Sequence, residues 1–215
     1  MGRKINPKVI RMGINRTWDS MWYASKKQFP KTLAGDILIK RKVKKVMNDA
    51  GLDSIKVHRG LGKIEVVAFV ARPGVAIGRG GEGVDALQKE LRRIAKSPVE
   101  LKIREVKKAD LSARIVARSI ADGIERRQPS KFLVQNAGEK IMQSGAKGYK
   151  IWVAGRINKA SQARTVKASA GSVPSQTFRA DIDYANEVAL TPDAGLMGIK
   201  VWINRGDKME IDREE

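Results

Sequence analysis

The stretch Ile77-Gly78-Arg79-Gly80-Gly81 joins a strand-like run to a helical pattern through a basic, glycine-rich loop. Gly78 and Gly81 let the backbone come close to a sugar-phosphate chain, and Arg79 adds positive charge, so the candidate RNA-binding residues of the loop are Gly78, Arg79, Gly80 and Gly81. The start of the following helix offers free N–H groups to phosphate oxygens. The stretch therefore predicts a loop that binds nucleic acid, with a purely structural turn as the alternative.

The segments around this loop alternate between strand and helix patterns. Before it, apolar spacing predicts a helix around residues 39–47, a short strand at 55–57 and a buried strand at 63–71. After it come a helical pattern at 84–94 and a half-covered strand at 99–104. This order is typical of a type II KH domain, which we place at residues 35–108. The GxxG spacing recurs at Gly145 and Gly148, where a preceding helical pattern favours a helix cap and a tight turn.

Composition points to a polyanionic partner. The 215 residues include 43 Lys or Arg against 23 Asp or Glu, a net charge of +20 at pH 7. Charge alone does not choose among RNA, DNA and anionic lipid. Residues 1–45 hold 13 Lys or Arg and 2 Asp, so we expect residues 1–34 to be a basic extension that orders against RNA through Lys4, Arg11 and Arg16. Residues 207–215 are expected to form an acidic tail.

The residue inventory argues against several kinds of site. The chain has no Cys, which excludes disulfide and thiolate chemistry, and its one histidine, His58, sits beside Arg59 in a strand-like segment. Asp181 and Asp183 would suit a carboxylate metal site, but their alternation with Ile182 more simply describes a strand with one polar face. We expect no metal, no cofactor and no small-molecule substrate. No apolar run reaches transmembrane length and the start is too polar for a secretory signal, so we expect a cytoplasmic protein without a membrane partner.

Two helices and a change of period describe the second half of the chain. Val116, Ile120 and Ile124 recur every four residues in one helix, and a second helix is expected at about 129–144. From residue 149 the period changes to two, which predicts four strands. The pattern indicates an α+β domain at 109–206, with two helices against an antiparallel sheet.

The first and last of these four strands mirror each other, Lys-Ile-Trp-Val against Lys-Val-Trp-Ile. Trp152 and Trp202 thus share a strand face with lysines, an arrangement that suits stacking on a nucleic-acid base. Burial of the two rings against a neighbouring element is the interpretation that we favour.

Several motifs occur in order along nearly the whole chain: Met1-Gly2-Arg3-Lys4-Ile5-Asn6-Pro7, Ala71-Arg72-Pro73-Gly74, Gly145-Ala146-Lys147-Gly148, Gly155-Arg156, Ala163-Arg164-Thr165 and Arg179-Ala180-Asp181-Ile182-Asp183-Tyr184. Together they resemble the bacterial form of the small ribosomal subunit protein three family. The resemblance implies a type II KH domain, a family-specific C-terminal domain, and a place in the small-subunit head. It also implies binding to ribosomal RNA, binding to messenger RNA at its entry channel, and contact with small-subunit proteins ten and fourteen.

The same resemblance implies a basic rim that takes part in opening messenger duplexes. Arg126, Arg127 and Lys131 match this rim, but Phe132 and Gln135 stand where well-known bacterial members have basic residues. These two departures put duplex opening in doubt. The usual glycine pair after Gly155-Arg156 is also replaced, by Asn158-Lys159, which would alter a local RNA contact.

The sequence thus predicts binding without bond chemistry. Affinity for RNA should fall roughly 10³- to 10⁵-fold between 50 and 200 mM salt if six to ten phosphates are engaged. The residues expected to neutralise phosphates are Lys4, Arg11, Arg16, Arg79, Arg126, Arg127, Lys131, Arg156 and Arg164. Two alternatives stay open: a free KH-domain regulator or assembly factor, and a nuclease or lyase. A lyase needs a desolvated amine, whereas these lysines sit in crowded basic runs.

Overall fold

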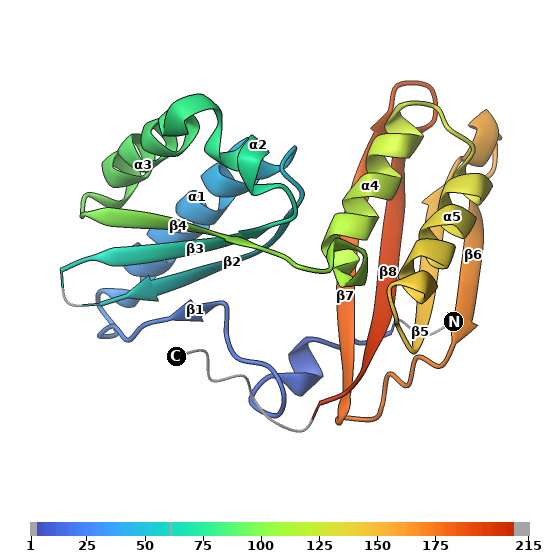
Figure 1. Cartoon of the computed structure of the whole chain (residues 1–215), viewed down its shortest axis with the longest axis horizontal. Helices are drawn as coiled ribbons and strands as arrows, with labels where there is room; N and C mark the ends of the chain where they lie inside the picture. Colours follow the sequence, from blue (N-terminus) through green and yellow to red (C-terminus); the bar gives the residue numbers. More distant parts are fainter. Residues whose placement is uncertain (1–3, 61, 209–215) are drawn as a thin grey trace. The chain divides into compact units, whose positions relative to one another are not determined.

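A computed structural model describes residues 4–60 and 62–208, apart from the side chain of Arg79. The described chain forms two compact units (Figure 1). One unit spans residues 18–107. The other joins residues 4–17 to residues 108–208, so its parts come from both ends of the sequence.

The unit of residues 18–107 has the predicted KH arrangement. Its elements are β1 (Ser20–Met21), α1 (Phe29–Met47), β2 (Leu52–Arg59), β3 (Ile64–Val70), α2 (Pro73–Ile77), α3 (Glu82–Ala95) and β4 (Val99–Glu105). The sheet order is β1-β2-β3-β4, with β2 and β3 antiparallel and β4 parallel to β3. The type II prediction is confirmed, while the two-residue edge strand β1, which pairs parallel to β2, is an addition to it.

The core of this unit lies between one face of the sheet and helices α1 and α3. Every second residue of β3, from Ile64 to Val70, joins the same buried cluster as Ile39 of α1 and Leu91 of α3. Val46, an apolar residue within the predicted helical stretch 39–47, is half exposed. Spacing by four residues from Ile39 already fills the inward stripe of the helix, so Val46 falls beside it.

The second unit contains the predicted two helices and antiparallel sheet. Its main elements are α4 (Ala113–Glu125), α5 (Ser130–Gln143), β5 (Gly148–Gly155), β6 (Arg164–Gly171), β7 (Ala180–Thr191) and β8 (Gly195–Asp207). The strand order is β6-β5-β8-β7, and every neighbouring pair is antiparallel. Helix α4 packs on β7 and β8, and α5 packs on β5 and β6 (Figure 1).

Helix α5 approaches the sheet closely because it carries a glycine at the contact. A Cβ at Gly138 would lie 2.2 Å from the hydroxyl oxygen of Tyr149 on β5. The glycine that weakens the helical pattern in the sequence therefore has a packing role. Ser144 ends the helix, and Gly145 follows with a φ of +93°, which fits the predicted helix cap and turn at this second GxxG copy.

Residues 4–17 pack on the C-terminal unit instead of forming a separate extension. Their anchor is Arg11, which is fully buried at the end of the short 3-10 helix Val9–Arg11. The Arg11 guanidinium donates hydrogen bonds to the carbonyl oxygens of Pro7 (2.9 Å), Pro174 (3.3 Å), Ser175 (3.2 Å), Thr177 (2.7 Å) and Ala180 (2.7 Å). These acceptors offset the cost of burying the charge. Residues 4–17, which were expected to order against RNA, are therefore already held by contacts with their own chain.

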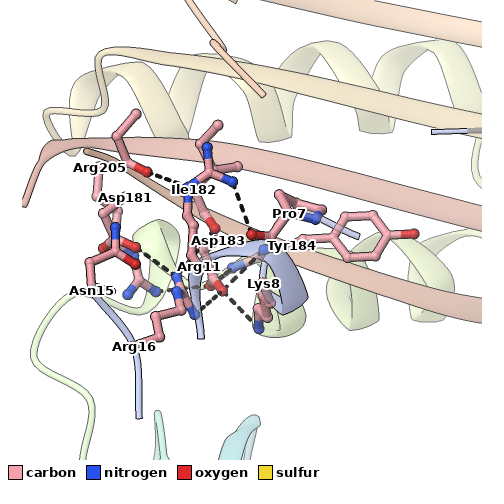
Figure 2. A network of polar contacts seen from close by, with 12 residues as sticks. Pro7, Lys8, Arg11, Asn15, Arg16, Asp181, Ile182, Asp183, Tyr184 and Arg205 are labelled. Atoms are coloured by element: carbon pink, nitrogen blue, oxygen red, sulfur yellow. Dashed lines mark hydrogen bonds and ion pairs between the residues drawn. The ribbon is translucent and has the colours of Figure 1, made fainter. Parts of the chain in front are cut away.

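A buried carboxylate completes this attachment (Figure 2). Asp183 of β7 lies 2.8 Å from the Lys8 ammonium, 3.5 Å from Arg16 and 2.9 Å from Arg205, and it accepts the backbone N–H of Ala113 at 2.8 Å. Burial alone would raise the pKa of Asp183, but the charges of the three cations outweigh it and lower the pKa to about 2. Asp181 pairs with Arg16 at 2.8 Å. Both carboxylates that would suit a metal site thus bind basic side chains.

Candidate nucleic-acid interface

The glycine-rich loop connects α2 to α3 through three residues that have positive φ angles. Gly78 ends α2 at φ +73°, and Gly80 and Gly81 follow at +62° and +86°. A side chain would strain the backbone at all three positions. A Cβ at Gly80 or Gly81 would meet no atom within 4 Å, so the loop backbone is open to an approaching ligand. The Arg79 side chain lies outside the described residues.

The first turn of α3 combines an open N-terminus with acidic side chains. No side chain caps the helix at Gly81, which leaves the first N–H groups without a side-chain acceptor. Glu82 and Asp85 lie in the first turn and stabilise the helix start through its dipole. These carboxylates repel a phosphate, so an incoming sugar-phosphate chain would be expected to approach the glycine backbone rather than the centre of the helix end.

A second basic surface lies at the connection between α4 and α5. Arg126 caps the C-terminus of α4, Arg127 has a positive φ of 63°, and Lys131 lies in the first turn of α5. All three side chains are exposed, as is the neighbouring Phe132. The structure therefore brings the three predicted rim residues into one exposed loop and helix start.

The loop between β5 and β6 extends this surface. The Asp193 carboxylate lies 2.8 Å from the Lys159 ammonium of that loop and 3.9 Å from Arg127. The hydrogen bond from Lys159 is the main cause that lowers the pKa of Asp193. Sequence reasoning did not identify Lys159 or Asp193 as site residues, because their pairing joins loops far apart in the chain.

Arg156 and Arg164 lie at the two ends of the same β5–β6 connection. Arg156 follows β5, and its Nε donates to the Ala160 carbonyl oxygen at 2.9 Å, which holds the exposed side chain against its own loop. Arg164 begins β6 opposite Gly155 and is exposed. Both remain accessible to phosphate. Asn158 and Lys159 of this connection both adopt positive φ angles.

The three predicted N-terminal residues differ in their availability. Lys4 is exposed, whereas Arg16 is mostly covered and its guanidinium binds Asp181 and Asp183. Arg11 is buried and bound to carbonyl oxygens of its own chain. This corrects the prediction that Arg11 neutralises phosphate, because no guanidinium nitrogen reaches the surface. Net charge in the sequence gave no sign that carbonyl groups near residue 180 accept this cation.

Trp152 and Trp202 contact each other on the sheet face that α4 and α5 leave uncovered. Trp202 is buried with Ala180 and Ile182, and its ring lies edge-on to Trp152 with centroids 5.1 Å apart. Burial, the favoured interpretation, therefore describes Trp202. Trp152 is only partly buried.

Residues 4–60 and 62–208 meet the requirements of neither a metal site nor a membrane-spanning helix. Within these ranges, no three His, Cys, Asp or Glu residues are grouped in a way that could hold a metal ion. No helix in the described part of the chain is long and apolar enough to cross a membrane.

Comparison with known proteins matches both units to described families. Residues 38–111 match the family model described as "KH domain", and residues 120–203 match "Ribosomal protein S3, C-terminal domain". A small ribosomal subunit protein uS3 from Lactobacillus gasseri is 42% identical over 207 residues, which cover 96% of this chain and 92% of the relative. The protein of the same name from Caldicellulosiruptor saccharolyticus is 42% identical over 96% of this chain and 93% of its own. The protein of the same name from Ligilactobacillus salivarius is 39% identical over 100% of this chain and 97% of its own. The protein described here therefore belongs to the ribosomal protein S3 family, whose members are structural components of the ribosome and not enzymes.

Proposed function

We propose that the protein is a structural constituent of the small ribosomal subunit that binds ribosomal RNA through phosphate contacts and works in translation as part of the cytoplasmic ribosome. The observation that carries this proposal is the exposed glycine loop at the α2–α3 junction of the KH unit. Its three positive φ angles and open surroundings allow close backbone approach to a nucleic-acid strand. The net charge of +20 supplies the electrostatic attraction.

The finer placement, at the messenger entry channel, is supported by the basic surface of the C-terminal unit. Arg126, Arg127 and Lys131 are exposed together at the α4–α5 connection and would contact messenger RNA. Phe132 and Gln135 are exposed beside them but carry no charge. We therefore expect contact with messenger without efficient duplex opening.

Contact with small-subunit proteins ten and fourteen is a further part of the proposal. Helix α1 carries Phe29, Leu33 and Ile37 at four-residue spacing, and each of these side chains is between 41% and 47% exposed. An apolar stripe of this kind is suited to burial against another protein. Replacing Leu33 with Asp should weaken co-purification with those proteins and leave RNA affinity nearly unchanged.

A charge-matched pair of variants tests the glycine loop. Changing Arg79 and Gly80 to Asp should weaken binding of a single-stranded U12 RNA at least tenfold. Gly62→Asp with Lys63→Asp is the control, because it makes the same charge change at another open glycine of positive φ in the same unit. Filter binding between 50 and 200 mM salt measures both. Equal affinities of the two variants, with unchanged circular dichroism, would remove the loop from the proposed mechanism.

Sedimentation distinguishes a resident constituent from a transient factor. In a cell lysate, a constituent should stay with the small subunit through a high-salt wash. Release of the protein by that wash would favour a free KH-domain regulator or assembly factor.

A further inference from the structure

The face of the C-terminal sheet opposite α4 and α5 carries a group of lysines. Ile151, Val153 and Val201 belong to the core cluster that includes both helices, so the alternate residues of β5 and β8 project from the other face. Lys150 and Trp152 of β5 lie on this other face. Trp152 is paired in register with Lys167 of β6 on one side and Lys200 of β8 on the other.

Three of the ammonium groups gather around one indole ring. Lys4 and Lys150 each place Nζ 4.9 Å from the ring centroid of Trp152, and Lys167 places its Nζ at 5.2 Å. We call Lys4, Lys150 and Lys167 the indole lysine cluster. The negative face of the ring attracts each cation and so partly offsets their mutual repulsion.

The cluster retains uncompensated positive charge. A hydrogen bond with Lys4, together with burial and the charges of Lys4 and Lys167, lowers the pKa of Lys150. Within residues 4–60 and 62–208, no carboxylate forms an ion pair with any of the three lysines, although other basic residues of this unit, such as Arg16 and Lys159, do have such pairs. A surface of this kind gains free energy when an anionic ligand neutralises it.

The fold delivers Lys4 to this face. Three residues farther along the chain, the Pro7 carbonyl accepts a hydrogen bond from buried Arg11, and Lys8 pairs with Asp183. These contacts fix the segment that carries Lys4 onto the C-terminal unit. Lys4, the third cation of the cluster, thus belongs to a segment, residues 4–17, that is fixed to the C-terminal unit.

We propose that the indole lysine cluster is a second RNA-binding surface, separate from the glycine loop, which takes the sugar-phosphate backbone. The inference rests on the proposed RNA-binding function. A polyanion suits this face because three ammonium groups lie over one partly buried ring, and exposed Lys200 is the register partner of Trp152 on β8. Base stacking is disfavoured because the ammonium groups lie over the ring and Trp202 abuts it. Trp152 therefore acts as a positioning residue that gathers the cations.

A charge-matched comparison tests the proposal in the full-length protein. The test variant carries Lys→Gln at Lys4, Lys150 and Lys167; the control carries it at exposed Lys45, Lys107 and Lys140, and removes the same charge. Filter binding to transcribed small-subunit ribosomal RNA measures the slope of log affinity against log salt concentration. Each lost phosphate contact lowers that slope by about 0.7 to 0.9, so the test variant should lose about 2 and the control less than 1.

The possible outcomes distinguish a failure of the proposed RNA-binding function from a failure of the second RNA-binding surface. If the wild-type protein shows no salt slope, both the proposed function and this inference fail. If the wild type binds but the test and control variants lose equal slope, the cluster is not an RNA surface. A test variant that binds RNA like the control, yet is missing from purified subunits, would point to a protein partner and also overturn the inference.

A spectroscopic readout checks the site directly. The indole N–H resonance of Trp152, assigned with Trp152→Phe, should shift on addition of U12 RNA. It should also shift in the Arg79→Asp, Gly80→Asp variant at RNA concentrations high enough for binding, because the cluster is separate from the glycine loop. An unmoved Trp152 resonance while other resonances shift would refute the proposal.

Discussion

Replacing Asp183 with Asn should loosen the C-terminal unit by removing the charge that holds Lys8, Arg16 and Arg205. Interaction with these cations lowers the pKa of Asp183 from its ordinary value of 3.8 to about 2. A difference of about 1.8 in pKa corresponds to about 2.4 kcal/mol, or roughly a 60-fold change in the unfolding equilibrium. The carboxylate is only 3% exposed, so solvent screening takes little from this figure.

The pH dependence has a definite sign. Because the folded-state pKa is lower than the unfolded one, the stabilisation is fully present above about pH 4. It is lost as the pH falls through 3.8 towards about 2, where half of the folded molecules carry a protonated Asp183. The difference between wild type and Asp183→Asn should therefore shrink to about twofold at pH 2.

Hydrogen exchange followed by mass spectrometry can resolve the two units separately. At pH 6, peptides from β5 and β8 of Asp183→Asn should exchange about 60-fold faster than in wild type, while peptides from β2 and β3 should be unchanged. Asp122→Asn is the matched control, since Asp122 forms a partly exposed ion pair with Arg118 and should change exchange by about twofold or less. Equal effects of the two substitutions, or an Asp183→Asn effect that persists at pH 2, would refute the reasoning.

Three other variants, each with a control, test different contacts. Gly138→Ala should destabilise the C-terminal unit by about 1–3 kcal/mol, because the new Cβ would collide with Tyr149. Gly74→Ala is the control: a Cβ at Gly74 would have no neighbour within 4 Å, so this change should cost less than about 1 kcal/mol. Urea denaturation measures both free energies of unfolding, and equal losses would contradict the packing account. Arg11→Lys should cost about 2 kcal/mol or more of folding stability, since an ammonium cannot reach the same set of carbonyl oxygens. Thermal denaturation measures this loss, and Arg93→Lys, at an exposed position, should be neutral in the same measurement. A neutral Arg11→Lys would show that the carbonyl contacts are dispensable. Changing Arg126, Arg127 and Lys131 to Gln should reduce the salt slope of RNA binding by about 2, and a loss no larger than that of the Lys45, Lys107 and Lys140 control would exclude the rim from RNA contact.

Periodic patterns predicted most of the fold, because each main element buries a regular stripe of its own residues. Val116, Ile120 and Ile124 do face the core of the C-terminal unit. The same holds for the alternating residues of β3. Strand β1 escaped prediction because a two-residue strand cannot show a period.

The candidate site was less accessible to sequence reasoning, because solvent exposure of a charge depends on partners far along the chain. Arg11 and Lys4 look alike in a basic opening segment. The structure separates them: carbonyl oxygens as much as 169 residues away bury Arg11, while Lys4 stays at the surface. Glycine patterning located the α2–α3 loop because positive φ is a local property of the backbone.

The attachment of residues 4–17 to β7 also has a consequence for biosynthesis. During translation, residues 4–17 leave the exit tunnel first. The carbonyl groups that accept hydrogen bonds from Arg11, between Pro174 and Ala180, follow more than 160 residues later. Residues 18–107 can complete their own sheet in the meantime, since all four of its strands lie within that span. The C-terminal unit can close only near the end of synthesis, at the entropic cost of joining such distant segments. A chain truncated before β7 would therefore carry a completely folded KH unit, while Arg11 and its neighbours in residues 4–17 would lack most of their hydrogen-bond acceptors.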